Sequence, residues 1–157
     1  MSPGESSPPQ HREADLDPLA DLDPFAFLMD ARMQFIAAVE ARGSAEPERV
    51  AIAVGAVVAH DQALREVVLA YASGDRLFEA VTTPLDRAQP GSIDDAYLAR
   101  NELFESLASI GESLPFGAEL ALPWTGLDTW RGHLIDLAMH EGAHAHALRE
   151  GEPLPST

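Results

Sequence analysis

The segment VAIAVGAVVAHDQALREVVLAYA (residues 50–72) determines which fold class we predict, because its valine-rich first half could be either a buried strand or part of a helix. No turn-forming residues bound that half on either side, and the apolar positions continue with a helical period through the whole segment. On a helix they form one stripe that consists of Val50, Val54, Val57, Leu64, Val67, Val68 and Tyr71. We therefore predict a single helix over about residues 46–72.

Three further segments have the amphipathic pattern of a helix, at about 24–42, 92–111 and 127–149. Their predicted inward stripes are Phe25, Leu28, Met29, Phe35, Ile36 and Val39 in the first, Ile93, Ala96, Tyr97, Leu103, Phe104, Leu107 and Ile110 in the second, and Trp130, Leu134, Leu137 and Leu148 in the third. No segment shows the sustained alternation of a strand. Four such helices, two of them followed by longer connections, predict an all-α protein, a four-helix bundle.

Residues that commonly begin or end helices stand at these boundaries. Asp23 can cap the free N–H groups of the first helix, and Pro24 suits its first position. The spacing of Ser92 and Asp95 resembles a capping box, with Asp in place of the usual Glu. Gly151 suits the end of the last helix.

The chain has 157 residues, which is the length of one domain. Residues 1–23 are rich in Pro, Ser and acidic side chains, and we predict a disordered tail there. Residues 24–150 are expected to form the bundle, and residues 151–157 a short C-terminal tail.

Charge and composition exclude several classes of function. The chain has 26 acidic residues against 10 basic ones, a formal charge of −16, which repels nucleic acids and anionic membranes. It has no cysteine, so disulfides and thiolate metal sites are absent. Because neither a secretory signal nor an apolar run of about 18–20 residues is found, we expect a cytoplasmic protein. Its expected partners are a small-molecule substrate and a second copy in a homodimer.

Two of the six histidines, His140 and His144, lie four residues apart on the last predicted helix. They are separated by about 40° around its axis, so both imidazoles can reach one metal ion. With Glu141 they complete the His-Glu-x-x-His pattern of zinc proteases. Only a short tail follows to supply a further ligand, and the chain has no room for a substrate-binding sheet, which argues against a protease.

The third ligand is expected on another helix. His60 shares the apolar face of the 46–72 helix with Val57 and Leu64. A single histidine on such a face is usually a hydrogen-bonded core residue. Three inward imidazoles on two helices are more simply satisfied by a shared divalent ion, with one coordination position left open. Zn²⁺, Ni²⁺ and Fe²⁺ all suit imidazole ligands.

Other polar residues near these histidines have two interpretations each. His133, seven residues before the first histidine of the pair, either acts as an acid–base or is a polar residue at the bundle mouth. Glu141 is a candidate general base or a support for the ligands, and we name it with His133 as a candidate catalytic residue. Asp61 and Asp136 either support the ligands or are solvated. His146 points away from the metal site.

These motifs resemble the DinB-like superfamily of metal-binding four-helix bundles. The resemblance is carried by His60 in VVAHDQALREVVLAYASGD and by the two histidines in LIDLAMHEGAHAHALREG. The stretches LPWTGLDTWRGHLIDLAMHEGAHAHA and SIDDAYLARNELFESL are similar to the DfsB/colibactin self-resistance branch. The resemblance covers roughly residues 25–150. The chain departs from it in residues 51–59, which lack the tryptophan common before the first histidine.

The resemblance implies a DinB-like fold in which His60, His140 and His144 hold the metal. Such relatives include thiol-dependent isomerases and transferases, which use mycothiol or bacillithiol, and hydrolases that disarm reactive natural products. We therefore expect a metal-dependent enzyme that acts on a small electrophilic molecule, with a low-molecular-weight thiol as a further cosubstrate. The alternatives are a non-catalytic bundle that sequesters a small molecule and a structural or partner-binding bundle whose histidines are core residues.

Overall fold

A computed structural model describes residues 23–74, 87–110 and 129–155. Within these ranges the chain forms four α-helices and no strand. They are α2 (Pro24–Arg42), α3 (Pro47–Ala72), α5 (Ile93–Ile110) and α6 (Trp130–Glu150). The all-helical prediction is thus confirmed, and the valine-rich stretch lies inside α3. The N-terminal tail predicted for residues 1–23 lies outside the described residues except for Asp23.

None of the described helices combines the length and the apolar character needed to cross a membrane.

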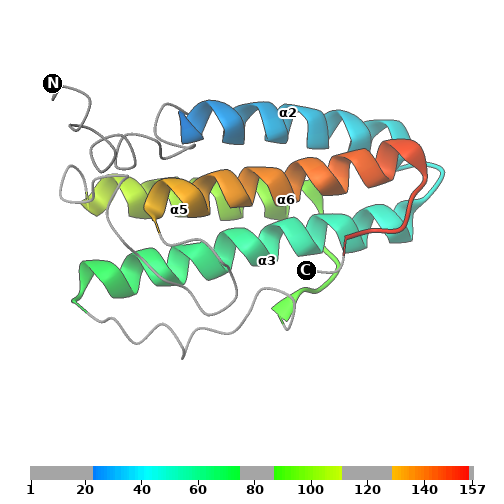
Figure 1. The fold of residues 1–157 in the computed structure, drawn as a ribbon. Helices are drawn as coiled ribbons and strands as arrows, with labels where there is room; N and C mark the ends of the chain where they lie inside the picture. Colours follow the sequence, from blue (N-terminus) through cyan, green and yellow to red (C-terminus); the bar gives the residue numbers. More distant parts are fainter. Residues whose placement is uncertain (1–22, 75–86, 111–128, 156–157) are drawn as a thin grey trace, which may run out of the picture.

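The helices pack as two parallel pairs, α2 beside α6 and α3 beside α5 (Figure 1). The N–H of Gly91 donates to the carbonyl of Ala51 at 3.0 Å, which brings the starts of α5 and α3 together. Arg42 Nη2 donates to the carbonyl of Arg149 at 2.5 Å, which joins the ends of α2 and α6. The end of α3 and the start of α5 therefore lie at opposite ends of a 26-residue helix. This topology accounts for a long connection between them.

Local signals begin and end the helices as predicted. Asp23 Oδ1 accepts from the backbone N–H of Phe25 at 3.0 Å, and Pro24 opens α2. Asp95 Oδ2 accepts from the backbone N–H of Ser92 at 2.8 Å, as in a capping box. Gly151 ends α6 with a left-handed φ of 70°, a conformation that favours glycine.

The residues after α6 return to the bundle. Arg49, at the start of α3, donates to the carbonyl of Ala147 at 2.8 Å and also to the carbonyl of Glu152. Leu154 packs against the core from its partly buried position. The first part of the segment that we expected to be a tail, residues 151–157, is therefore attached to the surface of the bundle.

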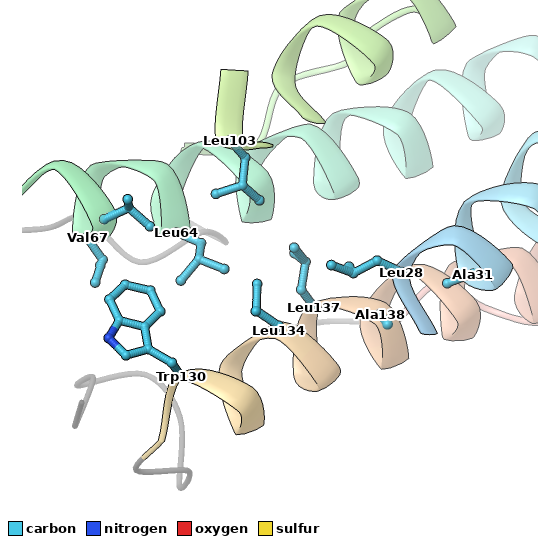
Figure 2. Packing of buried hydrophobic residues seen from close by; sticks show 10 residues of the cluster. Leu28, Ala31, Leu64, Val67, Leu103, Trp130, Leu134, Leu137 and Ala138 are labelled. Carbon is cyan, nitrogen blue, oxygen red and sulfur yellow. The ribbon is translucent and has the colours of Figure 1, made fainter. Parts of the chain in front are cut away.

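Buried apolar side chains form two clusters, one toward each end of the bundle. The first, shown in Figure 2, consists of Leu28, Ala31, Leu64, Val67, Val68, Leu103, Trp130, Leu134, Leu137 and Ala138. The second consists of Phe35, Ala38, Val50, Ala53, Val54, Val57, Ala96, Ala145 and Leu148. Every helix contributes to both clusters, and the level between them holds charged side chains.

Part of the predicted core was wrong. Met29 is 67% exposed and Tyr97 is 48% exposed, although both were placed on inward stripes. The buried line of α2 passes through Leu28 and Phe35, and this line is narrower than the apolar stripe of the sequence. Phe25, 37% exposed, instead packs edge-on against Phe104 of α5, with ring centroids 5.7 Å apart.

Candidate functional site

Each helix brings one charged residue to the level between the two apolar clusters. Arg32 comes from α2, Asp61 from α3, Arg100 from α5 and Glu141 from α6. The two carboxylates are 0% and 1% exposed, and the side chains of Arg100 and Arg32 are 7% and 12% exposed. We call these four residues the ion quartet.

The ion quartet is held by direct charged hydrogen bonds. Arg100 donates from Nε to Asp61 Oδ2 at 2.9 Å and from Nη2 to Asp61 Oδ1 at 3.1 Å. The same Nη2 lies 2.5 Å from Glu141 Oε1. Arg32 donates from Nε to Glu141 Oε2, and its Nη2 lies 3.5 Å from Asp61 Oδ2. Two guanidinium groups and two carboxylates thus balance each other in a closed arrangement.

Such burial is tolerated only because the charges are paired. Burial raises the pKa of Asp61, and the neighbouring Arg100 opposes this rise. Burial would lower the pKa of Arg100, but Asp61 and Glu141 outweigh this effect and raise it. Removal of one member would leave a buried charge without its partner, at a cost of about 3–5 kcal/mol.

Three imidazoles gather beside this level, between α3 and α6. The rings of His60 and His140 face each other with centroids 4.3 Å apart and an interplanar angle of 38°. His144 donates from Nδ1 to the carbonyl of His140 at 2.8 Å, which leaves the lone pair on its Nε2. We call these three residues the histidine cluster.

Two rings of the histidine cluster, those of His60 and His144, favour the neutral form. Burial, together with nearby His140 and His144, lowers the pKa of His60 to about 3. Burial also lowers the pKa of His144. Neutral imidazole is the form that binds metals, so these two rings are in the ligating form at pH 7.

The remaining predicted site residues lie in different surroundings. His133 is buried in α6. Asp136 Oδ2 lies 3.6 Å from His140 Nε2, one turn away on the same helix. His146 is exposed and lies 3.6 Å from a carboxylate oxygen of Glu152. Glu141 belongs to the ion quartet, where each of its carboxylate oxygens contacts an arginine.

The donor set of the histidine cluster fits a divalent transition metal by its chemistry, since it offers three imidazoles from two facing helices. In the part of the chain that the structure describes, no three His, Asp or Glu side chains are arranged to hold one metal ion. The types of the three residues and their proximity therefore suit a metal ion, but their side chains are not arranged in a complete coordination geometry.

A cavity of about 210 Å³ lies between α3 and α5, where residues 87–91 cross them. Its lining includes Gly55, Gln62, Arg87 and Glu102, and none of the three clustered histidines. Arg87 is already paired with Glu66 on α3, at 2.5 Å. The cavity and the histidine cluster are thus separate features.

The two arginines of the ion quartet were missed from the sequence, although a signal for them exists. Arg32 stands on the buried line of α2 between Leu28 and Phe35, and Arg100 stands between Ala96 and Leu103 on α5. A charge on an apolar stripe indicates a buried partner, but it does not say which one.

Neither the protein-family models nor the curated proteins nor the solved structures contain a match to this chain.

Proposed function

We propose that this protein is a metal-dependent enzyme whose divalent ion is bound by His60, His140 and His144. The observation that carries the proposal is the meeting of three imidazoles between α3 and α6, two of them with lowered pKa values. Neutral imidazole is the form that binds metals, and one shared divalent ion would be a ligand partner for rings from both helices.

The hydrogen bonds of the rings indicate which ring nitrogens would bind the ion. His144 uses Nδ1–H to bond the His140 carbonyl, so Nε2 is its ligand atom. Such a bond from the second ring nitrogen fixes the tautomer and orientation of metal-binding histidines in general. His60 and His140 lie ring to ring, so joint ligation requires rotation about their side-chain bonds. Asp136 is placed to orient His140 in this way, because its carboxylate lies 3.6 Å from Nε2.

Three protein ligands leave a coordination position for water or substrate, which is the pattern of catalytic sites. A bound Zn²⁺, Ni²⁺ or Fe²⁺ would act there as a Lewis acid that lowers the pKa of a water or a thiol. The protein's own contribution is to hold neutral rings in a partly buried place and to keep strong charges paired within the ion quartet. His133, buried near the start of α6, remains our candidate for proton transfer.

The reaction class comes from the resemblance to DinB-like proteins. We propose a cytoplasmic transferase or isomerase that uses a low-molecular-weight thiol, or a hydrolase, acting on a small electrophile. Turnover of a reactive epoxide, cyclopropane or thiol adduct by the metal-loaded protein tests this class. Tight binding of such a molecule without turnover would instead favour a sequestering bundle.

Metal content tests the site itself. We expect about one ion per chain in protein loaded with Zn²⁺ or Co²⁺ and then desalted, measured by elemental analysis. His60→Ala, His140→Ala and His144→Ala should each lose most of it, because a three-ligand site weakens strongly when any ligand is removed.

His146→Ala is the matched control, since this residue is exposed on the same helix and pairs with Glu152. Its metal content should equal that of the unmodified protein. Equal loss in all four variants would overturn the assignment of the ligands to one face of α6. No bound metal in the parent would mean that the histidines are core residues of a structural bundle.

A further inference from the structure

The histidine cluster lies across the boundary between the two helix pairs, where the helices pack less closely than within each pair. α2 packs mainly against α6, and α3 against α5, whereas α3 and α6 make fewer direct contacts. His60 belongs to one pair and His140 to the other. Apolar side chains of α3 and α6 meet in the two apolar clusters, as where Tyr71 packs edge-on against Trp130, and the ion quartet lies between these clusters.

The ion quartet connects the two pairs at that level. Arg100 of α5 bonds Glu141 of α6, and Arg32 of α2 lies in ion-pairing distance of Asp61 on α3. Unlike apolar contact, which is non-directional, a guanidinium fork holds a carboxylate in a defined orientation. Arg100 hydrogen-bonds both carboxylates, which links α3 directly to α6. Arg32 adds a weaker link, because it hydrogen-bonds Glu141 but only lies in ion-pairing distance of Asp61.

Each carboxylate of the ion quartet directly follows an imidazole in the sequence, as His60-Asp61 and as His140-Glu141. Adjacent helical residues differ by about 100° around the axis and about 1.5 Å along it. One member of each dipeptide therefore faces the bundle interior while the other faces the α3–α6 interface. A slide or rotation that displaces the carboxylate must displace the imidazole with it.

We propose that the ion quartet positions the histidine cluster: Arg32 and Arg100 fix the register of α3 against α6 through Asp61 and Glu141, and so set the approach of His60 to His140. This inference rests on the proposed function only in that it treats these imidazoles as the ligands. Arg32, Asp61, Arg100 and Glu141 are thus positioning residues, which act through the neighbouring rings.

The test replaces all four charges by apolar side chains of similar size, Arg32→Met, Asp61→Leu, Arg100→Met and Glu141→Leu. Replacement of a whole buried ion network by apolar residues commonly preserves the fold. We expect helical circular dichroism and a cooperative melt. The NOE between the ring protons of His60 and His140 in metal-free protein should be lost, and the Co²⁺ affinity should fall by about 10–100-fold.

The matched control removes an ion pair of the same type at the surface, Glu66→Gln with Arg87→Met. That pair joins α3 to the segment before α5 and lies outside the ion quartet. The NOE and the Co²⁺ affinity should be unchanged in this control.

If the fourfold variant does not fold, Arg100→Lys decides the question. Lysine keeps the charge but cannot bond Asp61 through two nitrogens and Glu141 at the same time. We expect a folded protein with a weakened ring NOE and about tenfold lower Co²⁺ affinity. A folded variant of either kind that keeps the NOE and its Co²⁺ affinity within about twofold overturns the inference. A parent protein that shows the NOE but binds no Co²⁺ overturns the proposed function alone, because the NOE is read without metal.

Discussion

His60 illustrates what single residues contribute to this molecule. Its placement on the apolar face of α3 follows from helical spacing and was predicted. Its pKa of about 3 depends on burial and on the rings of His140 and His144, which belong to another helix. The distance between α3 and α6 cannot be derived from spacing along one helix, so the sequence did not reveal this shift.

The lowered pKa makes the stability of the metal-free protein depend on pH. Unfolded His60 has a pKa of about 6.5, so between about pH 6.5 and 3 the unfolded state holds a proton that the folded state lacks. The free energy of unfolding should therefore fall as the pH falls through this window, by up to about 1.4 kcal/mol per pH unit from His60. His144, whose pKa burial also lowers, acts in the same direction. Urea denaturation at several pH values measures the slope.

His60→Gln should reduce that slope and leave the contribution of His144, whereas His146→Gln, a change at an exposed position, should leave it intact. Identical slopes for the parent and His60→Gln would show that His60 does not remain neutral in the folded state.

At the scale of helices, the ends were predicted well because their signals are local. Asp23, the Ser92 and Asp95 pair and Gly151 each act within a few residues of the backbone groups that they satisfy or turn. The parallel pairing of α3 with α5 is non-local, and no sequence signal within either helix predicts it. The ion quartet was not predicted either, because its contacts are also non-local and its charges come from four different helices.

Gly55 tests the close approach of α3 to the segment before α5. A Cβ at this position would lie 1.8 Å from the carbonyl oxygen of Gln89, a backbone atom that cannot move alone. Gly55→Ala should therefore lower the free energy of unfolding by about 1–3 kcal/mol, although alanine is the better helix former. Thermal melting followed by circular dichroism gives the sign of the change.

Gly142→Ala supplies the opposite case within α6. A Cβ built at this glycine meets nothing within 4 Å beyond its adjacent residues and the backbone of its own helix, so mainly the helix propensity changes. A gain of up to about 1 kcal/mol is expected. If both alanine variants raise the melting temperature, the close contact between Gly55 and Gln89 is not a feature of the folded protein.

At the scale of the whole molecule, charge is organised in two ways. Inside, the two positive and two negative charges of the ion quartet cancel and separate two apolar clusters. Over the whole chain, 26 acidic residues outnumber 10 basic ones, and the formal charge is −16. Composition revealed the net excess directly, whereas the internal balance requires the spatial arrangement of the four helices.

The net charge predicts how salt affects stability. Mutual repulsion of the acidic residues opposes compaction, and dissolved ions screen exposed charges more than buried ones. Raising NaCl from about 20 mM to about 300 mM at neutral pH should stabilise the protein by roughly 1 kcal/mol, or about 2–4 °C in Tm for a chain of this size. The variant with an apolar ion quartet should gain the same amount, because the quartet is buried and neutral overall. A Tm that falls with salt would show that attractive surface pairs outweigh the acidic excess. A gain confined to the parent would show that salt acts on the interior of the bundle instead of its surface.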